Sequence, residues 1–465
     1  MAMSIFSFLF RRKKGPIALQ YAIPGHLQVE ATGEAIFDEA LFASNESFSK
    51  PLAFLSFGLA LTSFSKGQEG STSFPKAAFD YLKPCGFKKI EATADYFRLP
   101  TIDTLGAVFG YQKIKIGKKK VKMIAIGIRG GNYGAEWASN VTIGSKGPHE
   151  GIAKAGEKLF EDFLCYLQEK KIRGPIAVWV SGFSRAAGAA NCLVKRLVQS
   201  SKQLGKARLD PSHIYAYAFA SPRVHLPEDK DLPIYNLVNP GDMVPTLPFE
   251  EYGLIRSGQE IILPETDEAV AAILEGYGRK EIPFFSVKRL DYLHILDSSK
   301  RIKDDPLRAS MSQGEFLAQF GALIASSISR EDYATHLQSG AVRLASLVDS
   351  SKPSPYGELM RFCRELISFF LAKEGKALLF HAMNKRFDWG PVLRESVEEV
   401  GKECSLDEKA REEVADMFCF VFSALRPKLS DFFAYLPTLS VSQTGHCLLF
   451  AHEPLVYYAL LTEFS

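Results

Sequence analysis

One stretch of this chain, VWVSGFSRAAGAANCLVKRL over Val178–Leu197, restricts the possible folds more than any other. Its apolar start predicts a buried strand over Ile176–Val180, and its later residues predict a helix over Arg185–Leu204. Ser184 lies at the corner between them, among small residues that let a helix pack closely against the strand. That is the geometry of a nucleophile elbow. Because Ala186 occupies the last glycine position of Gly-x-Ser-x-Gly, the corner alone fits a structural turn equally well.

Strands alternate with helices through the first half of the chain. A continuous apolar run ends at Arg129, and a helix is predicted over 150–170. Further strands are predicted over 214–220 and 234–238. Parallel strands need crossover helices, which then cover both faces of the sheet. The sequence therefore predicts the α/β fold class with a mostly parallel central sheet, whose functional residues gather at the carboxyl ends of strands.

The hydrophobic pattern changes after residue 258. Segments such as GEFLAQFGALIASSI and AREEVADMFCFVFSAL have the spacing of helices. We therefore expect an N-terminal tail over 1–36 and a core over 37–258. A large all-helical insertion or cap is expected over 259–436, followed by a return to the core over 437–465.

An activated serine requires a base, and the base requires an acid that orients it. Asp242 follows the strand predicted over 234–238 and is the candidate acid, although aspartate is also common in turns. His446 and His452 both lie after the helical segments, in the order Ser, Asp, His that such corners use. We favour His452, which precedes a predicted helix with Pro454 in its first turn. His446 remains the alternative and also fits the start of a strand.

Two backbone N–H groups are candidates for stabilising an oxyanion. The first belongs to Arg185, which follows the serine at the start of the predicted helix, where backbone donors lack intrahelical partners. The second belongs to Gly131, in the Gly-Gly sequence after the early apolar strand. Glycine lets the backbone approach a substrate closely there.

Taken in order, several segments resemble the class 3 (fungal-type) lipase family of α/β-hydrolases, and most closely a bacterial branch of lipase-family proteins. The segments are IGIRGG with the following EW, HEGIAKA, VWVSGFSRAAGAANCL, YAYAFASPRV, YNLVNPGDMVPTLP and AHEPLVYYALL. They cover about residues 121–258 and the C-terminal segment. The resemblance implies an α/β-hydrolase fold. The helical region between the acid and the histidine departs from the family, because it is much longer than in the fungal enzymes.

The resemblance also implies roles for individual residues. Ser184, Asp242 and His452 correspond to the nucleophile, acid and base of a catalytic triad. Gly131 and Arg185 correspond to the two oxyanion donors, and no cofactor or metal is implied.

Three positions depart from the family pattern. Phe183 stands where histidine is usual, and Ala186 stands where glycine is usual. The early corner reads Arg-Gly-Gly, so the hydroxyl that often assists the oxyanion hole is missing. This leaves oxyanion stabilisation to the backbone, assisted by Asn132 or Tyr133.

The implied function is hydrolysis of carboxylic, lipid-like esters through an acyl-enzyme intermediate, with an acyl ester or lipid as the partner. The alternatives are a catalytically silent hydrolase fold used for binding and an acyltransferase that uses the same serine. The 56 Lys and Arg residues nearly balance the 53 Asp and Glu residues, which does not favour nucleic acid as a partner. The seven cysteines are scattered without a Cys-x-x-Cys pair, unlike a disulfide framework or a zinc site.

The N-terminal segment places its apolar stretch before its charges, which is the reverse of a secretory signal. No run reaches the ~18 apolar residues of a membrane span. We expect a cytoplasmic location, with non-classical export as the alternative. Ile5–Phe10 followed by Arg11–Lys14 suits transient contact with an anionic membrane surface, or a solvated terminus. The basic run Lys113–Lys122 predicts a solvated hairpin whose lysines protect a sheet edge.

Overall fold

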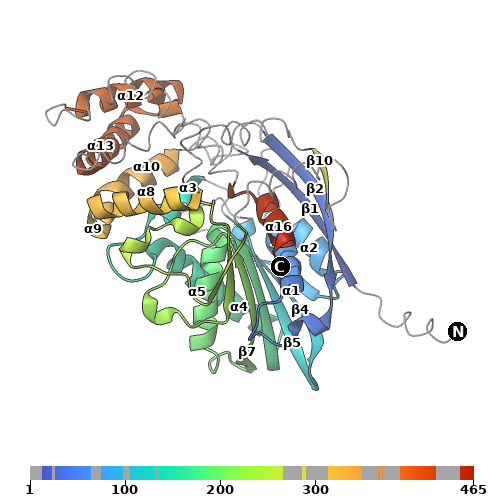
Figure 1. Cartoon of the computed structure of the whole chain (residues 1–465). Coiled ribbons are helices and arrows are strands. Elements are labelled where there is room, and N and C mark those ends of the chain that lie inside the picture. Colours follow the sequence, from blue (N-terminus) through green and yellow to red (C-terminus); the bar gives the residue numbers. More distant parts are fainter. Residues whose placement is uncertain are drawn as a thin grey trace.

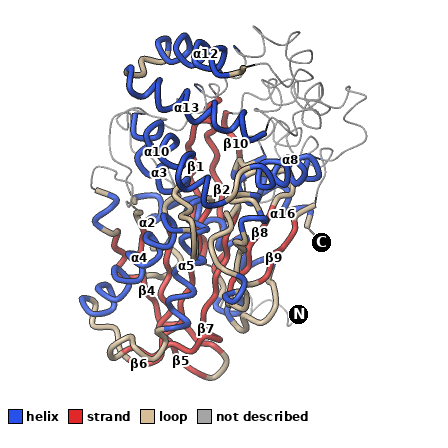
Figure 2. Tube along the Cα trace, turned by 90° about the vertical axis from the view of Figure 1, so that its left-hand side faces the viewer, coloured by secondary structure: helices blue, strands red, loops and turns tan. Residues whose placement is uncertain are grey.

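The structure is a computed structural model of the chain (Figures 1 and 2). It describes residues 13–23, 27–63, 75–97, 105–130, 134–264, 285–289, 313–347, 362, 365–366, 369, 388–425 and 451–464. Within them, a large sheet carries helices on both faces, a small sheet lies against one of those helical layers, and a further group of helices lies near one end of the large sheet.

Seven strands form the large sheet, in the order β3-β4-β5-β6-β7-β8-β9. The neighbours from β5 to β9 run parallel, whereas β3 pairs antiparallel with β4 and β4 with β5. The predicted α/β class with a mostly parallel central sheet is therefore confirmed, and helices occupy much of the region expected to be an insertion. The strands are Lys88–Ala92 (β3), Ala107–Ile116 (β4), Lys119–Ile128 (β5), Gly174–Phe183 (β6), Ala207–Phe219 (β7), Ile234–Val238 (β8) and Gln259–Ile262 (β9).

Helices cover both faces of this sheet because successive side chains of a strand point to opposite faces. In β6, Ile176, Val178 and Val180 enter one core, and Ala177 and Trp179 enter the other. The first core includes residues of α4 (Glu150–Glu169) and α5 (Arg185–Gln199), and the second includes residues of α1 (Lys50–Ser63), α2 (Lys76–Leu82) and α16 (Pro454–Glu463).

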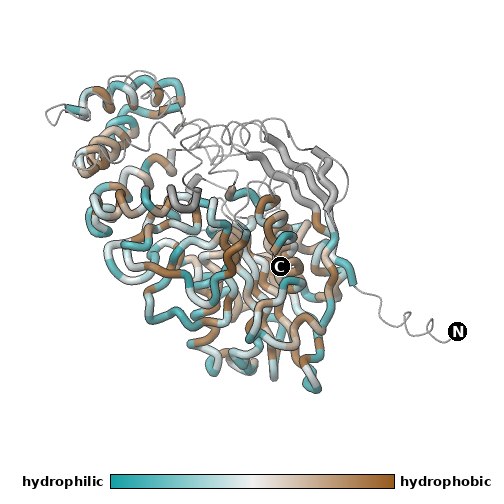
Figure 3. Tube along the Cα trace, viewed as in Figure 1, coloured by the Kyte–Doolittle hydropathy of each residue, from teal (hydrophilic) through white to brown (hydrophobic). Residues whose placement is uncertain are grey.

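Helix α1 is apolar on all sides because it is covered on all sides. It contacts β6 of the large sheet, the C-terminal helix α16, and strands of the small sheet. Leu52, Phe57 and Leu61 are all buried along its length. Figure 3 shows this concentration of hydrophobic residues beside the C-terminus. The first and last described helices of the core thus share one buried layer.

The region expected to be an N-terminal tail contains two long strands instead. β1 (Lys13–Ile23) and β2 (Leu27–Phe37) pair antiparallel, and β10 (Phe285–Arg289) adds a third strand to β2. Pairing satisfies the backbone groups along the edge that β1 and β2 share, and Ile17 and Phe37 are buried in the core that contains α1.

Strands also occur in the region expected to be all-helical from residue 259. β9 covers the edge of β8 by pairing parallel with it over Tyr235–Val238, and β10 joins the small sheet. The predicted boundary at 258 therefore falls inside the large sheet. The four residues Gln259–Ile262 form a further edge strand beside β8, which the helical spacing does not reveal.

The helices of the insertion form two small apolar clusters of their own. The described helical elements of the insertion are α8 (Gln313–Ser327), α9 (Arg330–Asp332), the π-helical turn η7 (Tyr333–Leu337), α10 (Gln338–Leu347), α12 (Gly390–Glu403) and α13 (Glu408–Leu425). Arg330 attaches the group to the core by donating to the carbonyl oxygens of Ile143, Gly144 and Gly147 at 2.8–3.0 Å. The Tyr252 hydroxyl donates to the Ile328 carbonyl at 2.9 Å, and α10 packs against α3 (Gly134–Val141).

The lysine-rich run Lys113–Lys122 forms the predicted hairpin between β4 and β5, with Gly117 in the left-handed region at φ 59°. The short helical turns are Glu39–Phe42 (η2), Ala94–Tyr96 (η3), Pro227–Asp229 (η4), Val244–Thr246 (η5) and Glu250–Tyr252 (η6). None of the described helices is long and apolar enough to cross a bilayer. The N-terminal Ile5–Phe10 segment, Arg11 and Arg12 lie outside the described residues, whereas Lys13 and Lys14 begin β1.

Candidate active site

The serine corner is a sharp turn between β6 and α5. Ser184 has φ 60° and ψ −127°, a backbone conformation that non-glycine residues rarely adopt. Its N–H donates to the Phe219 carbonyl of β7 at 2.8 Å, and its carbonyl accepts from the Ala187 N–H at 2.8 Å. Neighbouring structure therefore holds a conformation that costs on the order of 1–3 kcal/mol.

Steric contacts explain the small residues around this corner. A Cβ on Gly182 would lie 2.6 Å from the Ala186 carbonyl carbon and 3.0 Å from the Ala186 side chain. A larger residue at either position would push α5 away from β6. Alanine at 186 is accommodated because the opposing residue is glycine, so this departure from the Gly-x-Ser-x-Gly pattern leaves the turn intact.

Three predicted side chains meet at the carboxyl end of the sheet. Ser184 Oγ lies 2.9 Å from His452 Nε2, and His452 Nδ1 lies 2.7 Å from Asp242 Oδ2. The pairs are separated by 268 and 210 residues in the sequence, so only folding brings them together. Asp242 is fully buried, whereas the His452 side chain is 18% exposed. This geometry suits a neutral imidazole that donates from Nδ1 to the carboxylate and accepts from the serine hydroxyl.

Asp242 is fixed by two further donors. The Tyr457 hydroxyl donates to Oδ2 at 2.7 Å, and the Val244 N–H donates to Oδ1 at 2.8 Å. Burial raises the pKa of Tyr457 well above its usual value, and the adjacent Asp242 charge raises it further. The phenol therefore remains protonated and keeps its donor role. Both carboxylate oxygens are thus held in place before the imidazole contributes its hydrogen bond.

Asn239 connects the turn that carries the acid to the segment that carries the histidine. Its Nδ2 donates to the Ala451 carbonyl at 2.8 Å, immediately before His452. Its Oδ1 accepts from the Gly241 N–H at 3.1 Å, and its own N–H donates to the Tyr457 hydroxyl at 3.2 Å. The sequence patterns predicted neither Asn239 nor Tyr457. The only available signal was their position, within a few residues of the candidate acid and base.

Phe183 forms an apolar wall behind the imidazole. Its ring centroid lies 5.3 Å from that of His452 and 5.4 Å from that of Tyr457. Phe183 is itself buried. A phenyl ring at this position limits the orientations of the histidine without offering a competing hydrogen bond, so the departure from the family pattern is compatible with the site.

The predicted oxyanion donors are only partly within the described chain. Arg185 is the first residue of α5, next to Ser184, and its buried side chain donates from Nε to the Ser139 hydroxyl of α3 at 3.0 Å. Gly131, Asn132 and Tyr133 lie outside the described residues. The role of Gly131 and of the Arg185 N–H therefore stays a prediction.

A buried ion pair connects the described residues on either side of residues 131–133. The Arg129 guanidinium pairs with the Glu136 carboxylate, and both side chains are at most 1% exposed. The guanidinium also lies over the Tyr96 ring, 5.4 Å from its centroid. These contacts link the end of β5 to α3, which packs against the insertion.

Of the remaining histidines, His149 caps the N-terminus of α4 and its Nε2 lies 3.1 Å from the Asn140 carbonyl oxygen. Burial lowers its pKa to about 4, and the charges of Arg330 and Arg185 act in the same direction. His446 lies outside the described residues. In the part of the chain that the structure describes, no group of three or more His, Cys, Asp or Glu residues is arranged to hold a metal ion.

No protein-family model matches the chain, and the search of curated proteins finds no match. Among solved structures, the chain overlaps with Rhizomucor miehei lipase in its propeptide complex at 19% identity and a TM-score of 0.32, over 47% of this chain and 70% of that one. It overlaps with a mutant form of MDLA from Penicillium cyclopium at 17% identity and a TM-score of 0.30, over 48% and 83%. A third structure, titled as fungal lipases, overlaps at 18% identity and a TM-score of 0.27, over 46% and 78%.

Proposed function

We propose that this protein is a serine hydrolase that cleaves carboxylic, lipid-like esters through an acyl-enzyme intermediate. One observation carries the proposal: the continuous hydrogen-bonded series from Ser184 through His452 to Asp242, on a strained strand–helix corner. A purely structural serine turn requires neither an imidazole at the hydroxyl nor a buried carboxylate behind that imidazole. The coincidence of all three therefore supports a nucleophile rather than a turn.

In the proposed acylation step, Ser184 Oγ attacks the ester carbonyl carbon while His452 Nε2 takes the hydroxyl proton. Asp242 holds the imidazole by its Nδ1–H and stabilises the imidazolium that forms. The imidazolium then gives its proton to the leaving alkoxide, and the acyl group remains on Ser184. In the second step, water loses a proton to His452 and attacks the acyl carbon. The bond to Ser184 Oγ then breaks, the imidazolium returns its proton to Oγ, and the carboxylic acid is released.

The backbone N–H groups of Gly131 and Arg185 are the proposed donors to the oxyanion. Removing one such donor typically costs ~3 kcal/mol of transition-state stabilisation. Arg185 is well placed for this role in the chain, because it follows the nucleophile at the start of α5.

The proposed substrate class is an acyl ester with an apolar acyl group. The sequence resemblance to lipases suggests lipid esters, and Phe183 gives the site an apolar wall next to the imidazole. The insertion is the proposed pocket wall or lid, since α10 contacts the α3 helix and Arg330 holds the loop that follows α3. Transient contact of the N-terminal segment with a membrane surface is part of the same proposal.

An active-site fluorophosphonate probe and nitrophenyl esters test the proposal. We expect the probe to label Ser184, as located by mass mapping, and the protein to hydrolyse short-chain nitrophenyl esters. Ser184→Ala should lower turnover by about 10⁶-fold and abolish labelling. Ser212→Ala, at an exposed serine on β7, is the matched control and should behave as the unmodified protein.

The same experiment distinguishes the alternatives. Absence of labelling at Ser184, with a folded protein, would contradict the hydrolase proposal and leave a silent scaffold used for binding. Labelling without hydrolysis, but with transfer of the acyl group to an added alcohol, would identify an acyltransferase.

A further inference from the structure

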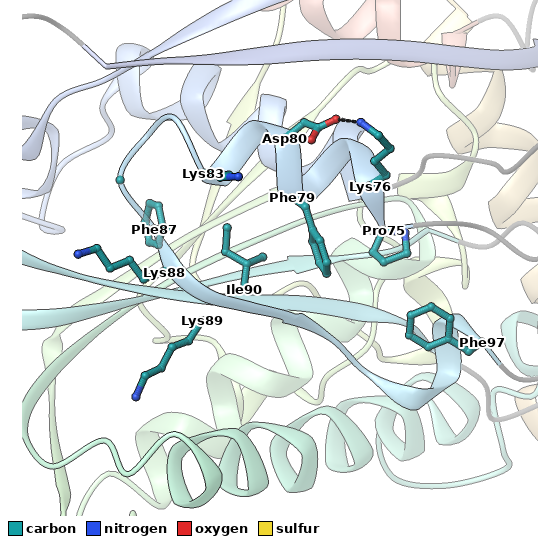
Figure 4. Close-up of a pocket in the computed structure, with 11 residues that line it drawn as sticks. Pro75, Lys76, Phe79, Asp80, Lys83, Phe87, Lys88, Lys89, Ile90 and Phe97 are labelled. Atoms are coloured by element: carbon teal, nitrogen blue, oxygen red, sulfur yellow. Dashed lines mark hydrogen bonds and ion pairs between the residues drawn. The ribbon is translucent and has the colours of Figure 1, made fainter.

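A groove of about 800 Å³ lies between helix α2 and strand β3. This volume is within the ~300–1,000 Å³ typical of small-molecule sites. Figure 4 shows Phe79 projecting from α2 toward Ile90 of β3, with Phe87 beside them. Phe87 is buried, and Phe79 and Ile90 are half-buried. The floor of the groove is therefore apolar and built from both elements.

The rim of the groove is cationic. Four lysines and one carboxylate line it: Lys76, Lys83, Lys88, Lys89 and Asp80. Asp80 pairs with Lys76, and Lys89 donates to the Lys170 carbonyl at 2.9 Å. Lys83 and Lys88 have no carboxylate partner among the residues that the structure describes. Within the described part of the chain, two ammonium groups beside an apolar floor therefore lack a matching negative charge.

The two ends of the groove differ in character. Lys83 and Lys88 lie near Phe87, whereas Pro75 and Phe97 line the opposite end (Figure 4). Phe97 is 56% exposed, which is unusual for a large hydrophobic side chain in the described part of this protein. A groove with positive charge at one end and an exposed aromatic ring at the other matches a single-chain amphiphile with an anionic head.

We propose that this groove binds one long-chain fatty-acid anion. Its carboxylate lies between Lys83 and Lys88, and its chain crosses Phe79 and Ile90 toward Phe97. The choice of a carboxylate head over a phosphate head rests on the proposed function, because ester cleavage releases a carboxylic acid. The groove would then hold the class of molecule that the active site produces.

This site is separate from the candidate active site. β3 is the edge strand, three positions from β6 in the sheet, and that is on the order of 14 Å at the usual strand spacing. None of the residues lining the groove belongs to the Ser184, His452 and Asp242 series. Lysines on an edge strand also discourage pairing with other chains, but that purpose needs neither the apolar floor nor the exposed Phe97.

Equilibrium dialysis with labelled palmitate, below its critical micelle concentration, tests the proposal on the full chain. The active site is first blocked with the fluorophosphonate, so that binding there does not contribute. We expect one palmitate per chain, at least tenfold weaker binding of hexadecanol, and no binding of butyrate. The first comparison isolates the charge of the head, and the second isolates the chain.

Two double variants locate the site. Lys83→Glu with Lys88→Glu should weaken palmitate binding by about tenfold or more, because two attractive charges become repulsive. Lys202→Glu with Lys206→Glu, at exposed lysines after α5, changes the net charge equally and should leave binding unchanged. Phe97→Ser should weaken palmitate and hexadecanol by similar factors, about threefold or more, since it shortens the apolar contact.

Equal palmitate binding by both double variants would overturn the groove assignment. Loss of all palmitate binding on blocking Ser184 would overturn it too, because the only site would then be the active site. Hexadecyl phosphate binding without palmitate binding would overturn the carboxylate assignment. If the probe fails to label Ser184, the proposed function fails, yet the two double variants still decide whether the groove binds palmitate.

Discussion

The two sides of the candidate active site are built differently. On the acid–base side, Asp242 and His452 are fixed by Asn239 and Tyr457, and all of these residues belong to the core or its last helix. On the oxyanion side, Arg185 contacts α3 through Ser139, and α3 packs against α10 of the insertion. One side is therefore complete within the core, and the other is connected to an additional group of helices.

This difference predicts that substitutions on the two sides have different effects. The proposed acid–base side consists of buried and part-buried hydrogen bonds that hold the carboxylate and the imidazole in place, which suits proton transfer. The oxyanion side contains a buried ion pair and a buried neutral histidine, both of which depend on how α3 and the following loop are held. We therefore expect substitutions on the first side to change kcat with little change in stability, and substitutions on the second side to change stability as well.

The largest expected effect is that of Asp242→Asn. Loss of the carboxylate removes the group that orients the imidazole and stabilises its charge, so kcat should fall by ~10⁴-fold. Steady-state kinetics with a nitrophenyl ester measures this loss, and thermal unfolding tests whether the fold is kept. A loss of less than tenfold would show that Asp242 does not act on His452.

Glu136→Gln should have the next largest effect, now on stability. It replaces the carboxylate that pairs with the buried Arg129 guanidinium by a neutral amide, which should lower the free energy of unfolding by roughly 3 kcal/mol. Denaturant unfolding measures this change. Asp416→Asn, which breaks the exposed pair with Arg394, is the control and should cost at most ~1 kcal/mol. Equal effects of the two variants would argue against an energetic role for the buried pair.

Acid should destabilise the protein through His149. Its pKa is lowered to about 4 by burial, against a usual value near 6.5 in the unfolded chain. As the pH falls from about 6.5 to about 4, the unfolded state binds a proton at His149 that the folded state does not bind. The free energy of unfolding therefore decreases by roughly 3 kcal/mol over this range. His149→Asn keeps a capping side chain without titrating and should reduce the decrease.

His225 provides an internal comparison for this measurement. Burial also lowers its pKa to about 4, and its Nδ1 lies 2.6 Å from the Ser257 hydroxyl oxygen. The His149→Asn variant should therefore retain about half of the contribution that the two histidines make between pH 6.5 and 4. Denaturant unfolding across that range measures it, and an unchanged pH dependence in the variant would contradict the assignment.

Tyr457→Phe should have the smallest effect. Loss of one hydrogen bond to the carboxylate should lower kcat by about tenfold. Steady-state kinetics with the same nitrophenyl ester measures this loss. Tyr215→Phe removes a buried hydrogen bond to the Phe42 carbonyl and is the control. An equal loss of kcat in both variants would indicate a general structural effect.

The sequence predicted the sheet and its serine corner well because both depend on local patterns. β6, α5 and β8 follow from continuous apolar runs and from small residues at fixed spacing. The strands of the N-terminal hairpin were missed, since their partner β10 lies about 250 residues later and their burial depends on α1 and other helices. Tyr457 was missed for a similar reason: an apolar helix that contains a tyrosine does not indicate which buried group its hydroxyl will meet.

By itself, the sequence determined the α/β fold class, the sharp turn at Ser184, and the order of serine, acid and histidine along the chain. These follow from hydrophobic periodicity and steric limits that act over a few residues. The tertiary structure alone decided which histidine within the described chain lies at the serine, which hydroxyl and amide hold the acid, and where lysines surround an apolar groove. Those outcomes depend on contacts between residues hundreds of positions apart, or on how a helix lies over a strand, and no local pattern encodes either.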